Sequence, residues 1–272
     1  APVQISYLGY PGTMAADFID YLVADPVLIP EAERRHYSES IVYLPNSYQP
    51  NDDRRAIAGT RTSRADFGLP EEVFVFCCFN NNYKIGPREF DIWMRLLERV
   101  DSSVLWLLRS NRWAEANLRR EAAARGIDPA RLVFADRLPQ GEHLARHAHA
   151  DLFLDTFVCN AHTTASDALW AGLPVITRPV RQFAGRVAAS LLTAAGLPEL
   201  IADTDDGYEA RALRYATDAE ALWEVRANLA ANRGTAPLFD TARYTRDFEA
   251  ALDAVFQRHV EGLAPADLHV GS

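Results

Sequence analysis

Two short polar stretches carry side chains that could bind a phosphate. His162, Thr163 and Thr164 lie in "CNAHTTASDALWAG", between a buried apolar run and a predicted helix. A helix N-terminus leaves N–H groups unpaired and carries about half a positive charge, so it attracts anions. The second stretch, "CFNNNYKIGP", follows an earlier apolar run and contributes the compact cation of Lys84. Ordinary helix capping by a Thr, and a solvated polar loop, are the alternatives to an anion site.

A third polar stretch, "DRLPQGEHLARHAHAD", admits two interpretations. His143 and His147 have the i, i+4 spacing of metal ligands on a helix, but the HExxH signature is absent, so no metal site is expected. The other interpretation is that the backbone of Leu138, the ring of His143 and the guanidinium of Arg146 hold a planar heterocycle. The spacing alone leaves this second interpretation open.

Two further patterns favour structural roles. "ADTDDG" contains D-x-D, which can hold a divalent metal, but it directly precedes a predicted helix, where Asp is a favoured cap. Arg178, Arg181 and Arg186 of "RPVRQFAGRV" could meet an anion, although surface charges are the simpler interpretation.

Apolar runs alternate with helical patterns from residue 73 to residue 196, which indicates a parallel sheet covered on both faces. In such a sheet, ligands bind beyond the carboxyl ends of the strands, where the polar stretches lie. We therefore predict one doubly wound α/β domain over 67–240. Its expected strands are 73–80, 103–109, 131–136, 151–156 and 174–178, and its expected helices are 87–100, 112–126, 141–150, 163–172, 185–196, 207–217 and 219–233.

The flanking segments are less regular. "VQISYLG" and "ESIVYLP" predict two short strands, and "MAADFIDYLVAD" between them predicts a helix or a mixed segment. Residues 46–66 are polar, have no sustained period and are the best linker candidate. A long helix is predicted over 242–262.

Composition narrows the choice of partners. The 272 residues include 28 basic and 37 acidic ones, and this net charge of −9 argues against a broad nucleic-acid-binding surface. No run of about 18 apolar residues predicts a membrane span. Cys77, Cys78 and Cys159 form no spaced disulfide framework, which favours a reduced, cytoplasmic protein. Because a strand pattern begins within the first residues and no Met starts the chain, we expect a fragment of a longer protein.

Six stretches together resemble one family. "LGYPGT", "FNNNYKI", "SVLWLLR", "EHLARHAHADLFLDT", "CNAHTTASDALWAG" and "RVAASLLTAAG" are similar, in order and spacing, to the catalytic region of O-linked N-acetylglucosamine transferases. The resemblance covers nearly the whole chain, and the short linker looks like that of a bacterial homologue. It implies a GT-B fold, in which two Rossmann-like lobes enclose a nucleotide sugar. Residues 1–66 would then end the N-terminal lobe and form the linker, 67–240 would form the C-terminal nucleotide-sugar-binding lobe, and 241–272 would brace the lobes and form a tail.

The resemblance also implies roles for single residues. Lys84 is similar to the catalytic lysine that neutralises the diphosphate leaving group, and His162, Thr163 and Thr164 to the triplet that binds the phosphates. Asp167 is similar to the carboxylate that holds the ribose. The uracil would be held by His143, Leu138 and Arg146, and the sugar wall would include Leu8, Gly9, Pro11 and, nearby, Cys159.

Two positions depart from the animal members of the family. Asn81 stands where those enzymes have Gln, and Gln140 stands where they have Lys, so one implied ribose contact has no charge.

The implied reaction is an inverting, metal-independent transfer of N-acetylglucosamine from UDP-GlcNAc to Ser or Thr hydroxyls of proteins, with no cofactor. The implied partners are UDP-GlcNAc or UDP, a protein acceptor, and an N-terminal lobe and helical repeats of the same protein. No nucleic acid and no membrane is expected as a partner. The alternatives are a transferase that uses a small-molecule or lipid acceptor, and a UDP-binding module without catalysis.

Overall fold

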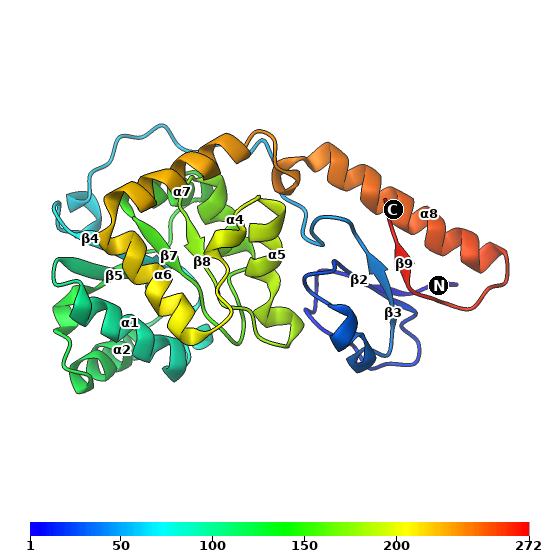
Figure 1. Ribbon diagram of the computed structural model, residues 1–272, viewed down its shortest axis with the longest axis horizontal. Coiled ribbons are helices and arrows are strands. Elements are labelled where there is room, and N and C mark those ends of the chain that lie inside the picture. Colours follow the sequence, from blue (N-terminus) through cyan, green and yellow to red (C-terminus); the bar gives the residue numbers. More distant parts are fainter. Residues whose placement is uncertain (272) are drawn as a thin grey trace.

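The computed structural model describes residues 1–271 and contains two parallel sheets, joined by a linker and a long helix (Figure 1). The larger sheet consists of β4 (Phe74–Cys78), β5 (Ser103–Leu108), β6 (Leu132–Ala135), β7 (Leu152–Leu154) and β8 (Val175–Ile176). Its strand order is β6-β5-β4-β7-β8, which is 3-2-1-4-5 when these strands are counted along the chain. This is the Rossmann-like order, and it confirms the predicted doubly wound α/β fold.

Helices follow the strands of this sheet as the alternating pattern predicts. On α1, Phe90, Trp93, Leu96 and Leu97 are buried at the spacing of one helical face, which explains why the helix packs on the sheet. The helices of this part are α1 (Pro87–Arg99), α2 (Arg112–Ala124), α3 (Gln140–Arg146), α4 (Thr163–Trp170), α5 (Val187–Ala194), α6 (Asp205–Thr217) and α7 (Ala219–Asn232).

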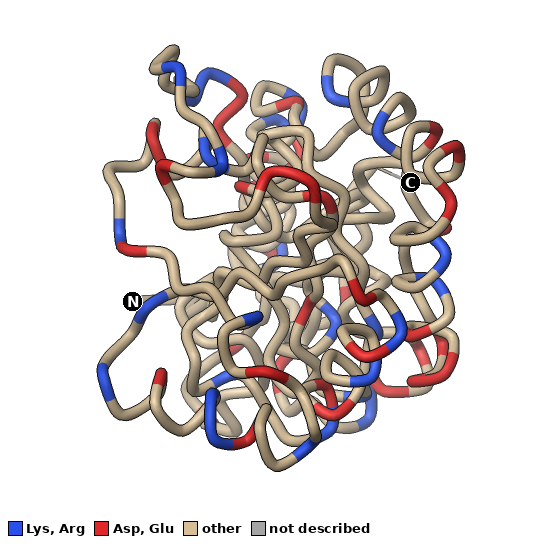
Figure 2. The backbone as a smooth tube through the Cα atoms, turned by 90° about the vertical axis from the view of Figure 1, so that its left-hand side faces the viewer, with Lys and Arg blue, Asp and Glu red and all other residues tan. Residues whose placement is uncertain are grey.

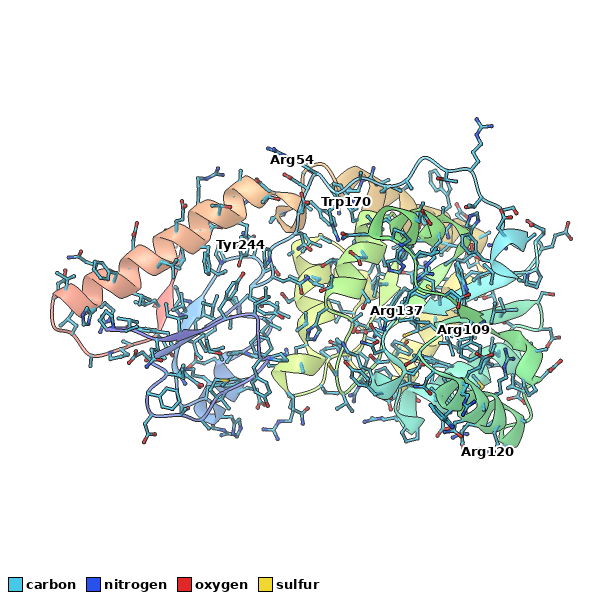
Figure 3. All side chains as sticks on the ribbon, turned by 180° about the vertical axis from the view of Figure 1, so that it is seen from behind. Arg54, Arg109, Arg120, Arg137, Trp170 and Tyr244 are labelled. Carbon is cyan, nitrogen blue, oxygen red and sulfur yellow. The ribbon has the colours of Figure 1, made fainter. Side chains whose placement is uncertain are left out.

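The smaller sheet joins the two ends of the chain. Its order is β1-β2-β3-β9, with β1 at Ile5–Ser6, β2 at Tyr21–Ala24, β3 at Ser40–Tyr43 and β9 at Leu268–His269. The long helix α8 (Thr241–Val260) leaves the larger lobe and lies across this sheet (Figure 1). Ala251 and Val255 of α8 form a small apolar core with Tyr21, Val23 and Val42. Tyr244 also points from α8 toward the sheet (Figure 3) and hydrogen-bonds the Tyr7 hydroxyl.

Two elements of the smaller sheet differ from expectation. The segment predicted as a helix or mixed segment contains the strand β2, because all four residues of Tyr21–Ala24 are buried between β1 and β3. Strand β9 was not predicted, and two residues carry too little pattern to indicate a strand. Ser272, the last residue of the predicted tail, lies outside the described residues.

A buried carboxylate fastens the smaller sheet to the larger lobe. Asp25 follows β2 and accepts hydrogen bonds from the Ser190 hydroxyl of α5 at 2.6 Å and from the Tyr48 amide at 3.0 Å. Arg186 adds a bond from its Nε to the Val27 carbonyl at 2.6 Å. The segment that follows β2 is thereby held against α5 of the larger lobe.

The linker is extended but attached along much of its length. We call residues 52–64 the strap; in Figure 1 the linker runs along the top of the larger lobe. The Ala58 amide donates to the Gly141 carbonyl at 3.0 Å, and Arg64 pairs with Asp151 at 2.9 Å. These contacts hold the strap against α3 and the start of β7.

The surface charge is mixed. Lys and Arg are interspersed with Asp and Glu along the chain (Figure 2). Over residues 1–271, none of the helices is both long enough and apolar enough to span a bilayer.

Candidate functional site

A cleft of about 510 Å³ opens beyond the carboxyl ends of β4 and β7, where the strand order of the larger sheet reverses. Ligands of doubly wound sheets bind at this switch point. The cleft brings together residues that are far apart in the sequence, including most of the predicted site. The predicted residues that line it are Asn81, Lys84, Leu138, His143, Arg146, His162, Thr163 and Thr164.

Two further cavities adjoin the β1 loop. One, of about 200 Å³, is lined by Leu8, His162, Thr163 and residues of the linker. The other, of about 410 Å³, includes Pro11 and Arg181. Four predicted residues line none of these three cavities: Gly9, Gln140, Cys159 and Asp167.

Helix α4 points its N-terminus into the cleft, and His162 is its N-cap residue. The His162 carbonyl accepts hydrogen bonds from the amides of Ala165 and Ser166, both at 3.1 Å. Within residues 1–271, the amides of Thr163 and Thr164 have no protein acceptor. Both N–H groups, and the exposed Thr163 side chain, are therefore directed at whatever occupies the cleft.

The ring of His162 has a different role from the phosphate contact that the sequence predicts. Its Nε2 donates to the Ala184 carbonyl at 3.0 Å. Burial lowers the pKa of His162 to about 4, so the ring is neutral at pH 7 and has a single N–H. That N–H is already bonded within the protein, so the imidazole orients the helix start and offers only an acceptor to the cleft.

The hydroxyl of Thr164 is also engaged within the protein. It donates to Oδ1 of Asn80, and Nδ2 of Asn80 donates to the Thr156 hydroxyl at 2.8 Å. Asn80 is buried at the end of β4, so this chain of bonds fixes the helix start to the strand. The sequence did not distinguish Asn80 from its neighbours in the three-Asn run.

Lys84 places a positive charge in the cleft, close to the helix start. Its Nζ donates to the Asn160 carbonyl at 2.8 Å, which holds the ammonium beside the loop that leads into α4. In the described part of the chain, no carboxylate forms an ion pair with Lys84. It is also the only lysine of the sequence. An anion in the cleft would therefore meet one free ammonium, two amides and one hydroxyl.

The other end of the cleft is built from aromatic and planar groups. The ring of His143 lies edge-on to Phe79, with 5.5 Å between ring centroids, and the Arg146 guanidinium lies 4.4 Å from the Phe79 centroid. Burial, with help from Arg146, lowers the pKa of His143 to about 4, so a neutral ring faces the cleft. This surface suits a flat, uncharged heterocycle.

Asp167 is buried between the cleft and the smaller cavity. Its Oδ1 forms an ion pair with Arg55 of the strap, and its Oδ2 lies 4.0 Å from Nε2 of His143. Burial raises the pKa of Asp167, and Arg55 opposes this shift. The sequence indicated Asp167 but gave no sign of Arg55, because the two residues are 112 positions apart.

A second carboxylate, Asp155, organises the loop beneath the helix start. It follows β7, is fully buried, and accepts bonds from the Thr177 hydroxyl at 2.6 Å, the Thr156 amide at 2.8 Å and the Ala161 amide at 2.6 Å. Burial raises the pKa of Asp155 to about 7. From the sequence, Asp155 was predicted only as part of an apolar strand. An Asp at the end of such a strand was the signal that could have marked it as a functional residue.

The D-x-D stretch, the Arg-rich loop and the second histidine of the i, i+4 pair all have partners within the protein. Thr204, rather than an Asp, caps α6 through the Gly207 amide at 3.0 Å, while Asp205 pairs with Arg88 and Arg178. Arg181 pairs with Glu33 at 3.1 Å. His147 donates its Nδ1 proton to the His143 carbonyl at 2.8 Å.

Gly185 shapes the turn that receives the His162 ring. A Cβ at this position would lie 2.2 Å from Cγ2 of Val180 and 2.6 Å from the Phe157 carbonyl oxygen. We therefore expect Gly185→Ala to lower the free energy of unfolding by about 1–3 kcal/mol, the usual cost of overpacking, in urea titrations. Gly59→Ala is the matched control, because no atom lies within 4 Å of its Cβ, and a similar loss there would contradict the steric explanation.

Comparison with known proteins identifies the family. The profile of glycosyl transferase family 41 matches residues 1–61 and 55–248. The chain is 40% identical over 276 residues to a probable UDP-N-acetylglucosamine–peptide N-acetylglucosaminyltransferase SEC of Arabidopsis thaliana, covering 99% of this chain and 28% of that protein. It is 43% identical over 202 residues to a UDP-N-acetylglucosamine–peptide N-acetylglucosaminyltransferase of Caenorhabditis elegans, covering 74% of this chain and 18% of that protein. The chain thus spans less than a third of the length of these relatives.

Comparison with solved structures supports the same family. An O-GlcNAc transferase variant from Thermobaculum terrenum superimposes with a TM-score of 0.81 at 29% identity, covering 95% of this chain and 48% of that one. Sucrose-phosphate synthase from Thermosynechococcus elongatus shares the fold at a TM-score of 0.61 and 14% identity, covering 90% of this chain and 59% of that one. Together with the family profile and the identity to the plant and nematode relatives, this shows that the chain belongs to glycosyl transferase family 41.

Proposed function

We propose that the cleft binds UDP-N-acetylglucosamine and that the chain supplies the UDP-binding lobe of a protein O-GlcNAc transferase. One observation carries this proposal: the unpaired ammonium of Lys84 and the N-terminus of α4 converge in one cleft. Oriented N–H groups at a helix start, next to a fixed cation, are suited to a diphosphate.

The rest of the nucleotide has a matching surface. Uracil would stack on the neutral ring of His143, with Leu138 and Arg146 at its edge, and Asn81 and Gln140 would lie near the nucleotide. The ribose would lie toward Asp167, whose Oδ2 is directed to His143. The relatives from Arabidopsis and Caenorhabditis are named for UDP-N-acetylglucosamine, which supports the choice of this ligand.

The sugar would lie between α4 and the loop after β1. Leu8 has a φ of 60°, a left-handed conformation that residues with a side chain rarely adopt and that is concentrated at functional sites. Leu8 also lines a cavity together with His162 and Thr163. Gly9, Pro11 and Cys159 would complete this wall.

In the proposed reaction, a Ser or Thr hydroxyl oxygen attacks the anomeric carbon from the face opposite UDP. The bond from that carbon to the β-phosphate oxygen breaks, the configuration inverts, and the hydroxyl proton passes to a base outside this chain. Lys84 and the amides of Thr163 and Thr164 stabilise the charge that develops on the leaving diphosphate. Because protein groups supply this positive charge, the proposed reaction uses no metal ion or other cofactor.

The proposal includes partners and a setting. The relatives are more than three times as long as the matched region, so an N-terminal lobe and helical repeats that recruit a protein acceptor are proposed as parts of the same enzyme. The thiols of Cys77, Cys78 and Cys159 are free, which favours a cytoplasmic location.

Calorimetry with UDP tests the proposal, with uridine as the control for the diphosphate. We expect UDP to bind and uridine to bind far more weakly, and the full-length protein to transfer GlcNAc to a Ser/Thr peptide. Equal affinity for UDP and uridine would contradict the diphosphate site. Tight UDP binding without transfer by the full-length protein would instead indicate a non-catalytic module or a different acceptor.

A further inference from the structure

The strap contributes a guanidinium to the wall of the ligand site. Arg55 forms an ion pair with Oδ1 of Asp167, and only 11% of its side chain and 9% of the Asp167 side chain are exposed. The strap is fixed at this point, because Nε1 of Trp170 donates to the Arg55 carbonyl at 3.1 Å. Figure 3 shows Trp170 beneath the strap, with the neighbouring Arg54 pointing away from the lobe.

The second terminal nitrogen of Arg55 has no partner. Among residues 1–271, Nη2 is buried and forms no hydrogen bond, although a buried donor of this kind normally has an acceptor. Arg55 lines the 200 Å³ cavity, which shares His162 and Thr163 with the main cleft. The residue that carries this unsatisfied donor therefore lines a cavity that reaches the helix start.

The Arg55–Asp167 pair has the chemistry that recognises neighbouring hydroxyls. A hydroxyl both donates and accepts, so one partner must be an acceptor and the other a donor. Asp167 offers carboxylate lone pairs and Arg55 offers Nη2, while their mutual ion pair leaves the unit without net charge. Such a unit suits a neutral diol better than a phosphate. The phosphate would instead be bound by the positive charge of Lys84.

We propose that Arg55 is a further ligand-binding residue, which donates from Nη2 to the ribose diol of the nucleotide while it holds Asp167 in place for the same diol. This proposal rests on the proposed function, because it requires UDP to occupy the cleft. It makes the strap part of the site rather than a passive linker.

The test is a cycle of four dissociation constants, measured by calorimetry on the full chain. Wild type and Arg55→Met are each titrated with UDP and with 2′,3′-dideoxy-UDP. We expect removal of the hydroxyls to weaken binding to wild type about 10- to 100-fold, and Arg55→Met to weaken UDP binding by a similar factor. Arg55→Met should then bind the two nucleotides with nearly equal affinity, because the shared interaction is already lost.

Two controls separate this role from a structural one. Arg54→Met removes a cation from the same strap, where 92% of the side chain is exposed, and should leave all affinities unchanged. Arg55→Lys keeps a cation beside Asp167 and should fold like wild type, but should also lose most of the preference for the diol.

The outcomes are distinct. If Arg55→Met lowers the affinity for UDP and dideoxy-UDP by equal factors, Arg55 is only structural and the inference is overturned. If wild type binds both nucleotides equally, the ribose assignment fails while the UDP site stands. If wild type binds no UDP, the proposed function fails first.

Discussion

Lys84→Met is expected to lower kcat for GlcNAc transfer about 100- to 1,000-fold in the full-length protein, the usual effect of removing one charge-stabilising donor. The ammonium is positioned by the Asn160 carbonyl, and among residues 1–271 no carboxylate lies within ion-pair distance of it. In the proposed reaction its interaction would strengthen as the diphosphate leaves, so KM for UDP-GlcNAc should change much less than kcat. Initial rates at several donor concentrations separate the two constants.

The matched control for Lys84 is Arg120→Met. Arg120 is an exposed cation on α2, far from Arg54 and the strap in Figure 3, and its loss should leave the rate unchanged. Because Lys84 is the only lysine in these 272 residues, an amine-reactive reagent applied to this chain modifies a single side chain, and UDP should protect it. A normal kcat in Lys84→Met would remove Lys84 from the mechanism.

Asp155→Ala is expected to have the largest effect on stability. It would leave the Thr177 hydroxyl and the amides of Thr156 and Ala161 buried without their acceptor. Each unsatisfied donor costs about 1–3 kcal/mol, so the free energy of unfolding should fall by about 3 kcal/mol or more. Urea titration at pH 7 measures this loss, and UDP affinity should fall too, because Asp155 supports the loop that leads into α4.

Asp155→Asn is the control, and its stability relative to wild type should depend on pH. The amide oxygen can still accept from both backbone amides, and the Thr177 hydroxyl can reverse and accept from the amide nitrogen. In wild type, burial raises the pKa of Asp155 to about 7, well above its ordinary value, so between about pH 4 and 7 the folded state holds a proton that the unfolded state has lost.

The stabilising effect of that proton is complete below pH 4 and is lost as the pH rises through 7, with a slope of up to about 1.4 kcal/mol per pH unit. The asparagine variant has no titrating group at this position, so its stability relative to wild type should increase from pH 5 to pH 8. A constant difference would contradict the assigned protonation of Asp155.

The features that the sequence predicted well are local. The helix start at Thr163 follows an apolar strand directly, so one short stretch contains the strand, the turn and the N-cap. Regular alternation from β4 to α5 predicted the doubly wound sheet, since each strand and helix carries its own period. Lys84 and His143 were candidates from their own polar stretches, and the resemblance to a known family gave them specific roles.

The features that it did not predict depend on distant partners. The strand β2 is set by neighbours on both sides, which the apolar residues in "FIDYLVAD" do not specify. The role of Arg55 depends on its ion pair with Asp167, and only tertiary folding brings these two distant residues together. The ring proton of His162 is directed by the Ala184 carbonyl, and no spacing rule links the two positions.

The most direct measurement is a crystal structure of the chain with UDP bound. The account predicts that the diphosphate lies within hydrogen-bonding distance of Nζ of Lys84 and of the amides of Thr163 and Thr164, with uracil against His143. UDP bound in another cavity, or in this cleft with its phosphates directed away from the start of α4, would contradict it.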